Sequence, residues 1–267
     1  MQAKTSGVEA SLRKVARAYR DARTFGPMVL FRRFLPRDVN GAISVNTHFG
    51  TVHLRPFDSD MTVLRQIFVN RDYDLTKYEQ FARINARYLA ILEAGETPVV
   101  IDAGANIGAS TLWFSRAFPE ARVLAVEPDT KNVAVCRMNC EATRNVTIVQ
   151  AAIGSSRGAA SLVRPDQSSW SIQVERGERG GDVEVKTVDD LLVLAGVGGK
   201  LFLVKIDIEG FEKDLFSVST DWLRDPAAVI IELHDWLSPY SSVPFQKAMA
   251  EYEAEVFISG ENLVFIK

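Results

Sequence analysis

The sequence has little cysteine, no long apolar run and no secretory signal. Its two cysteines, Cys136 and Cys140, match neither a CxxC pair nor a disulfide framework, so we expect reduced, structural thiols. No apolar segment approaches the roughly 20 residues that cross a bilayer, and the charged N-terminus lacks an apolar core. A cytoplasmic protein without a transmembrane segment is the resulting prediction.

The sequence also lacks the common phosphate-binding motifs. The GxGxxG pattern of dinucleotide-binding folds does not occur, because Asn106 occupies its middle position in "GANIG". The segment "GGK" is followed by Leu201, where a P-loop requires serine or threonine. Neither glycine-rich segment is therefore predicted to bind phosphate.

Positive charge is concentrated at the start of the chain, whose formal net charge is −3. The basic and acidic residues of segment 1–40 are Lys4, Arg13, Lys14, Arg17, Arg20, Arg23, Arg32, Arg33 and Arg37, against Glu9, Asp21 and Asp38. Such a segment can attract an anionic partner, such as a phosphorylated substrate, an acidic carrier protein or a membrane surface, although a solvated helix face needs no partner. We expect no nucleic-acid partner.

The chain divides into two predicted regions, 1–96 and 97–267. The first shows an amphipathic helical pattern over 8–35 that breaks near "FGP", and a hairpin over 42–55. A helix that begins at Ser59 and a longer helix over 76–94 follow. We predict that this extension acts as a lid or substrate region.

The second region alternates apolar strands with helices. Strands are predicted near residues 99, 122, 146, 201 and 227, Thr187 begins a capping box, and two alternating strands around Gly260 close the chain. The pattern predicts an α/β fold: a Rossmann-like, seven-stranded and mostly parallel sheet with helices on both faces and a C-terminal antiparallel hairpin.

The segment "VVIDAGANIGAS" places an acid and two glycines at the end of the first of these strands, where such sheets bind ligands. Gly104 permits the turn, and Gly108 permits close packing of the next helix. Glu127, at the end of the following strand, can accept both hydrogen bonds of a ribose diol. Asp102 would repel a pyrophosphate but suit a cation, so the residues favour S-adenosylmethionine over a nicotinamide dinucleotide.

Three longer strings, "VIDAGANIGAS…FP…AVEPD", "VKIDIEGFEKDLF" and "IIELHDW", resemble the FkbM-type class I methyltransferases. The segment "LRPFDSDMTVLRQIF" also resembles that family, so the resemblance covers about residues 52–236. It implies S-adenosylmethionine-dependent methylation, commonly of a hydroxyl on a sugar, a glycan or a polyketide-type natural product.

The resemblance also implies a cofactor site. By its motifs, the residues around the methionine part of the cofactor would be Asp102, Gly104, Asn106 and Gly108, with Glu127 at the ribose. The adenine site is less well marked: Gln150 and the backbone near Ala151 and Ala152 are the residues that the sequence offers.

Chemistry is expected at the ends of the fourth and fifth strands, where "KIDIEG" holds Asp207 and Glu209, and "IIELHDW" adds Glu232, His234 and Asp235. Asp207 and Glu209 lie two residues apart, so their side chains share one side of an extended segment. His234 is the predicted general base, because its ordinary pKa lies near working pH. The acids would position the acceptor hydroxyl and the ammonium group of the cofactor, and Lys205 either joins them or only pairs with a nearby acid.

A second mechanism uses a metal ion at the same strand ends. Asp207, Glu209, His234 and Asp235 are oxygen and imidazole ligands that could hold Mg²⁺ or another divalent ion and lower the pKa of a hydroxyl. The sequence alone does not decide between a base and a metal.

The substrate is the least determined part of the prediction. Residues 155–182 resemble an inserted hairpin that could cover an acceptor, with Trp170 placed either to stack on a sugar ring or to pin the hairpin to the core. Two alternatives to an O-methyltransferase remain: a NAD-dependent oxidoreductase and a catalytically silent cofactor-binding protein.

Overall fold

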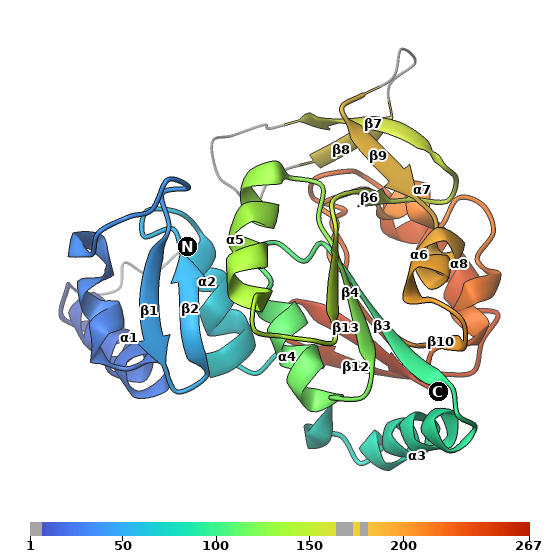
Figure 1. Cartoon of the computed structure of the whole chain (residues 1–267), viewed down its shortest axis with the longest axis horizontal. Coiled ribbons are helices and arrows are strands. Elements are labelled where there is room, and N and C mark those ends of the chain that lie inside the picture. The colour runs from blue at the N-terminus through green and yellow to red at the C-terminus, as the bar shows by residue number, and fades with distance from the viewer. Residues whose placement is uncertain (1–6, 164–172, 177–180) are drawn as a thin grey trace. The chain divides into compact units, whose positions relative to one another are not determined.

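The computed structural model (Figure 1) describes residues 7–163, 173–176 and 181–267. The chain forms two compact units, Met1–Arg71 and Asp72–Lys267. The sequence placed its boundary between residues 96 and 97. The difference is the segment 72–96, whose helix α3 (Phe81–Glu93) contacts the strands β3 and β10 of the larger unit.

The smaller unit packs helices against one hairpin. Its elements are α1 (Gly7–Phe25), η1 (Pro27–Phe34), β1 (Ile43–Thr47), β2 (Gly50–Leu54), α2 (Asp60–Leu64) and η2 (Arg65–Val69). The helical pattern over 8–35 breaks at "FGP" as predicted, because Gly26 has a φ of +82° and Pro27 follows it. The predicted hairpin is confirmed, with antiparallel pairing from Ile43 with Leu54 to Thr47 with Gly50.

A buried ion pair fixes α1 within this unit. The Asp21 carboxylate accepts hydrogen bonds of 2.8 and 2.7 Å from the Arg65 guanidinium of η2. The Phe25 ring packs edge-on against Phe68 at 6.3 Å between centroids. One side of α1 is therefore held by the smaller unit's own core.

The larger unit contains the predicted seven-stranded sheet. Its strand order is β12-β13-β11-β10-β3-β4-β5. The bounds are β3 (Thr97–Ala103), β4 (Arg122–Val126), β5 (Val146–Val149), β10 (Gly199–Ile206), β11 (Ala228–Glu232), β12 (Glu255–Ser259) and β13 (Asn262–Ile266). The pairs among β5, β4, β3, β10 and β11 are parallel, and β13 is antiparallel to both of its neighbours, which confirms the predicted fold class.

Helices pack on both faces of this sheet, as apolar strands require. Their bounds are α4 (Ala109–Ala117), α5 (Thr130–Cys140), α6 (Val188–Ala195), α7 (Glu212–Leu215) and α8 (Ser242–Met249), with short turns η3 (Leu75–Lys77) and η4 (Asp221–Arg224). One core cluster joins Ile101, Leu124 and Val204 of the strands to Leu191 of α6 and Phe245 of α8. Tyr88 of α3 contacts Phe118 and Phe202.

A second sheet was only partly predicted. It has the order β6-β9-β7-β8, with β6 (Ala152–Ile153), β7 (Gly158–Val163), β8 (Gln173–Arg176) and β9 (Val183–Lys186). The single strand expected near 146–153 is divided between the two sheets. The antiparallel pairing of β7 and β8 confirms the inserted hairpin, whereas Trp170 lies outside the described residues. Within the described ranges, none of the helices has the length and apolar character needed to cross a membrane.

Candidate functional site

The turn after β3 brings two strand ends into direct contact. β3 and β10 are adjacent, and the Asp207 backbone N–H donates to the Ala103 carbonyl at 3.1 Å. Gly104 has a φ of +76°, and a Cβ built on it would overlap the backbone carbonyl oxygen of Asp207. Glycine is therefore required here both for the backbone conformation and for the close approach.

Two further residues of this turn adopt the left-handed conformation. Gly108 has a φ of +82°, and a Cβ there would lie 2.8 Å from the Cys136 sulfur of α5. Asn106, with a φ of +50°, is a non-glycine residue in the same region of backbone space. Its backbone N–H donates to a carboxylate oxygen of Glu127 at 2.9 Å. The turn is thus anchored to the end of β4.

The carboxylates of Glu127 and Asp102 have different surroundings. Glu127 is buried at the pocket wall and also accepts from the Asp129 N–H at 2.9 Å and from the Asn132 amide at 3.3 Å. Burial raises the pKa of Glu127 to about 7.

Asp102 is buried behind the turn, where one oxygen accepts from Ser110 and Thr111 of α4. Asp102 is not among the pocket-lining residues, and its direct contact with a cofactor stays a prediction.

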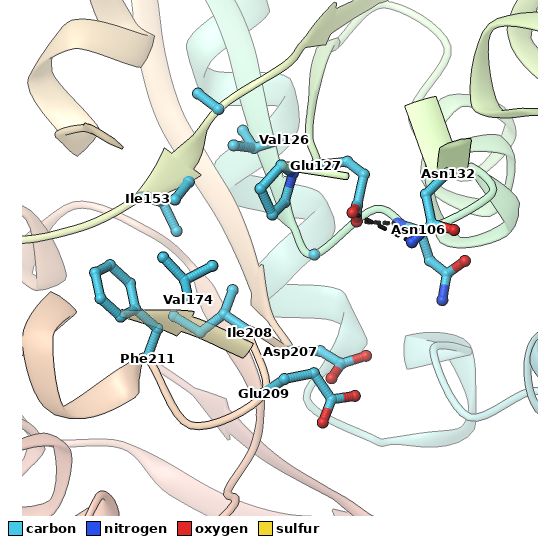
Figure 2. Close-up of a pocket in the computed structure, with 14 residues that line it drawn as sticks. Asn106, Val126, Glu127, Asn132, Ile153, Val174, Asp207, Ile208, Glu209 and Phe211 are labelled. Atoms are coloured by element: carbon cyan, nitrogen blue, oxygen red, sulfur yellow. Dashed lines mark hydrogen bonds between the residues drawn. The ribbon is translucent and has the colours of Figure 1, made fainter. Parts of the chain in front are cut away.

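Figure 2 shows the pocket that these elements form, with a volume of about 540 Å³ that includes space open to solvent. Its wall is polar on one side, at Asn106 and Glu127, and apolar on another, at Ile153, Val174 and Phe211. The full set of lining residues is Gly104, Asn106, Val126, Glu127, Pro128, Asn132, Ala151, Ala152, Ile153, Val174, Asp207, Ile208, Glu209 and Phe211.

Only some of the residues predicted to contact adenine line this pocket. Ala151 and Ala152 line it, whereas Gln150 is exposed outside the lining set and its amide donates to the Thr130 hydroxyl at 3.0 Å. The apolar side chains at Ile153 and Val174 were not predicted as site residues. They come from β6 and β8 of the second sheet. The sequence predicted one continuous strand through residue 153, so it did not predict that Ile153 belongs to a separate sheet.

Lys205 lies beneath the contact between the two strand ends. Its ammonium donates to the Gly104 carbonyl at 2.7 Å, and lies 3.3 Å from Asp102 and 3.5 Å from Asp207 carboxylate oxygens. Burial alone would lower the pKa of this ammonium. The surrounding oxygen atoms of Tyr73, Asp102 and Asp207 outweigh that effect and raise its pKa above the ordinary lysine value. The predicted pairing of Lys205 with a nearby acid is thus present.

Carboxylates surround the imidazole of His234, which is 1% exposed. Its Nε2 lies 3.7 Å from Asp207, 3.6 Å from Glu209 and 3.6 Å from Glu232 oxygens, all longer than a hydrogen bond. Its Nδ1 lies 2.8 Å from Glu212 Oε1, a hydrogen bond to a fully buried carboxylate. The sequence predicted Asp207, Glu209 and Glu232 at these strand ends but missed Glu212.

The electrostatics of this group follow from burial and crowding. Burial alone lowers the pKa of His234, but the hydrogen bond to Glu212 and the nearby acids raise it to about 9. Burial and the neighbouring Asp207 raise the pKa of Glu209 to about 8. The same two causes raise that of Glu232 to about 7. The imidazolium of His234 therefore loses its proton at a higher pH than an ordinary histidine, whose pKa near neutrality was the reason for predicting it as the base.

One of these acids, Glu209, lies in a segment with left-handed backbone conformation. Glu209 has a φ of +51°, and Gly210 follows with +94°, so the chain reverses directly after β10. One oxygen of Glu209 is buried without a hydrogen-bond partner in the described part of the chain. Asp235, predicted as a metal ligand, instead accepts from the Ser242 N–H at 3.2 Å. Of the described residues, the set with metal-ligand spacing is Asp207, Glu232 and His234, whose ligand atoms all lie within 4.8 Å of one another.

Comparison with known proteins identifies the family. The methyltransferase FkbM domain matches residues 102–254, more than half of the chain. "2-O-methyltransferase NoeI" of Sinorhizobium fredii is 23% identical over 171 residues, covering 57% of this chain and 70% of that protein. "Hexuronic acid methyltransferase AglP" of Haloferax volcanii is 27% identical over 152 residues, covering 57% and 62%.

A solved structure shows a weaker likeness. An O-methyltransferase from Bacillus cereus in complex with SAH is 15% identical, has a TM-score of 0.36, and is matched over 79% of this chain and 93% of its own. The family match decides between the two enzyme classes left open by the sequence, and the nicotinamide alternative has no support from it. The chain belongs to the FkbM methyltransferase domain family, and it is a methyltransferase.

Proposed function

We propose that this protein transfers a methyl group from S-adenosylmethionine to a hydroxyl of a sugar or a related natural product. One observation carries the proposal: Asp207 and Glu209 line the pocket and also lie 3.7 and 3.6 Å from His234. The pocket that would hold the donor and the group that would activate an acceptor therefore share two side chains.

The residues present fit an adenosyl cofactor. Glu127 offers carboxylate oxygens at the wall, and the Asn106 amide oxygen is buried without a hydrogen-bond partner among the described residues. The apolar side formed by Ala152, Ile153 and Val174 suits an adenine ring. Asp207 and Glu209 supply negative charge for a sulfonium and an ammonium group. When bound, the cofactor supplies an electrophilic methyl carbon.

His234 is the proposed base for the acceptor hydroxyl. Because the pKa of His234 is raised to about 9, the base would be the neutral imidazole, whose fraction rises as the pH approaches that value. Glu212 would hold its Nδ1–H tautomer, so that Nε2 can take the hydroxyl proton as the oxygen–carbon bond forms. Asp207 and Glu209 would orient the hydroxyl in line with the methyl group. The acids around Nε2 would stabilise the imidazolium that results.

A metal ion is the alternative way to activate the hydroxyl. The observation in its favour is the spacing of Asp207, Glu232 and His234, together with the carboxylate on the second nitrogen of the imidazole, which is common for metal-bound histidine. In that case His234 is a ligand and not the base. Loss of turnover on adding a chelator, restored by Mg²⁺, would establish this route, and indifference to chelators would exclude it.

The sugar-type acceptor rests on two kinds of support. The names of the relatives include a 2-O-methyltransferase and a hexuronic acid methyltransferase. Trp236 is 65% exposed, and its ring centroid lies 6.2 Å from that of His234. An exposed indole beside the proposed base can stack on a sugar ring. Trp236 is the proposed stacking residue among the described ones, whereas Trp170, considered for that role from the sequence, lies outside them.

Calorimetric titration tests the cofactor directly. S-adenosylmethionine and NAD would each be titrated into the wild-type protein, into Glu127→Gln and into the control Gln150→Ala, whose side chain lies outside the pocket lining. Binding of the sulfonium cofactor alone, weakened by Glu127→Gln and unaffected by Gln150→Ala, is expected. Binding of NAD, or of neither ligand, would overturn the proposal. Cofactor binding without methyl transfer to any hydroxylated acceptor would indicate the silent binding protein.

A further inference from the structure

The outer side of α1 carries an exposed apolar stripe. Leu12, Val15 and Tyr19 recur at spacings of three and four residues, so they lie along one side of the helix. They are 64%, 67% and 66% exposed. Over residues 9–25 of α1, whose burial is described, Asp21 and Phe25 are buried and hold another side of the helix to its own unit. We call Leu12, Val15 and Tyr19 the outer stripe.

The adjacent element also exposes apolar residues. The turn η1, which contacts α1, exposes four large hydrophobic side chains: Met28, Leu30, Phe31 and Phe34. Exposed large apolar residues are ordinary one at a time, but a set of seven on two adjacent elements indicates an interaction surface.

Positive charge accompanies the apolar surface. All five basic side chains of α1 are exposed: Arg13, Lys14, Arg17, Arg20 and Arg23. Of the two acids of α1, Asp21 is buried in its ion pair with Arg65. Residues 1–71 carry twelve lysines and arginines against five acids, whereas residues 72–267 carry nineteen against twenty-nine. The excess positive charge of the chain is therefore confined to the unit that exposes the outer stripe.

We propose that α1 and η1 bind the surface of an anionic lipid membrane, with the outer stripe inserted among the headgroups and the basic side chains on the lipid phosphates. A helix with an apolar stripe and many arginines is suited to lie in that interface. A second copy of the chain is a poorer occupant, because a symmetric contact along the stripe would bring the same arginines together. The proposal is independent of the methyl-transfer reaction.

Co-sedimentation of the full chain with lipid vesicles tests this inference. The protein is expected to pellet with phosphatidylcholine vesicles that contain about 30% phosphatidylglycerol, and to be released by about 0.5 M NaCl. Leu12→Ser/Val15→Ser/Tyr19→Ser should weaken partitioning about tenfold or more. Arg13→Gln/Arg20→Gln/Arg23→Gln should remove the preference for anionic vesicles.

The matched control is Val193→Ser/Val197→Ser/Val218→Ser, which changes three exposed valines of the larger unit and should leave partitioning unchanged. Circular dichroism and thermal melting would establish that each variant is folded. Failure of the wild-type protein to bind anionic vesicles, or equal binding by the outer-stripe variant, would overturn the proposal. A dimer that the outer-stripe substitutions dissociate would also overturn it, since the stripe would then be covered by a second copy.

Discussion

At the scale of single residues, the pocket places a carboxylate whose charge is sensitive to pH. Burial raises the pKa of Glu127 to about 7, so below that pH the free protein carries mostly the protonated acid. A ribose diol donates its hydrogen bonds best to the ionised form. We therefore predict that affinity for S-adenosylmethionine falls roughly tenfold from pH 8 to pH 6, measured by calorimetry.

The comparison with Glu127→Gln isolates this effect. The cofactor's own amino group also ionises in this range, but the variant corrects for it because its amide cannot titrate. A variant that retains the wild-type pH dependence would show that another group is responsible.

Glu212 is a second residue at the single-residue scale, where an effect on turnover can be separated from an effect on cofactor affinity. It lies outside the pocket lining but accepts a hydrogen bond from His234, if Nδ1 carries the proton. We predict that Glu212→Gln lowers turnover about a hundredfold, because the charge that supports an imidazolium is lost. Affinity for S-adenosylmethionine should be unchanged, and Lys213→Gln provides the neighbouring control. Equal losses of affinity and turnover would instead indicate a disturbed pocket.

The sequence was informative about the acids but not about their partners. Asp207, Glu209 and His234 follow apolar strands. Because parallel neighbouring strands end at the same edge of a sheet, the proximity of these three side chains was predictable. Glu212 reaches His234 only because Glu209 and Gly210 reverse the chain with positive φ values. No periodicity encodes that reversal. Asp235 accepts from the Ser242 N–H and is not in the described set with metal-ligand spacing, and its role as a ligand stays a prediction.

At the scale of elements, the contact between the β3 and β10 turns should be the least tolerant of added volume. Gly198→Ala, at a φ of +81° with open space around it, should cost about 1–2 kcal/mol of unfolding free energy from backbone strain alone. Gly104→Ala, at a similar φ, should cost at least about 2 kcal/mol more, because its Cβ must displace the Asp207 backbone. Urea denaturation measures both.

Gly108 gives an internal check of the same reasoning. Its added Cβ would lie 2.8 Å from the Cys136 sulfur, whereas the Cys136 Cα lies at 3.4 Å, so Gly108→Ala should be partly rescued by Cys136→Ala. Rescue of Gly104→Ala by any single side-chain truncation would contradict the backbone contact.

Elements with clear periodicity were predictable, and those set by tertiary context were not. The strand from 99, the capping box of Thr187 and Asp190, and the final hairpin are confirmed. The helix expected from residue 76 begins at Phe81, after the separate turn η3. The break predicted near "FGP" is also confirmed, since α1 ends at Phe25 and η1 begins at Pro27.

At the scale of the whole molecule, every pocket-lining residue belongs to the larger unit. A chain reduced to residues 72–267 should therefore fold and bind S-adenosylmethionine with wild-type affinity, as measured by thermal melting and calorimetry. If the N-terminal extension is a lid or substrate region, removing it should still lower turnover. Unchanged turnover would exclude that role, and loss of cofactor binding in a folded truncation would contradict the assignment of the pocket.

The pairing of β3 with β10 also bears on how such an enzyme can acquire new substrates. The proposed cofactor contacts, Asn106 and Glu127, follow β3 and β4, whereas Glu232 and His234 belong to β11 and the loop after it. These two halves of one sheet meet where the Gly104 turn contacts Asp207. The pocket lining ends at Phe211, before β11. Mutations in β11 and the loop after it can therefore reshape acceptor recognition while the pocket-lining residues are inherited intact, so related enzymes can diverge in acceptor without rebuilding the methyl-donor site.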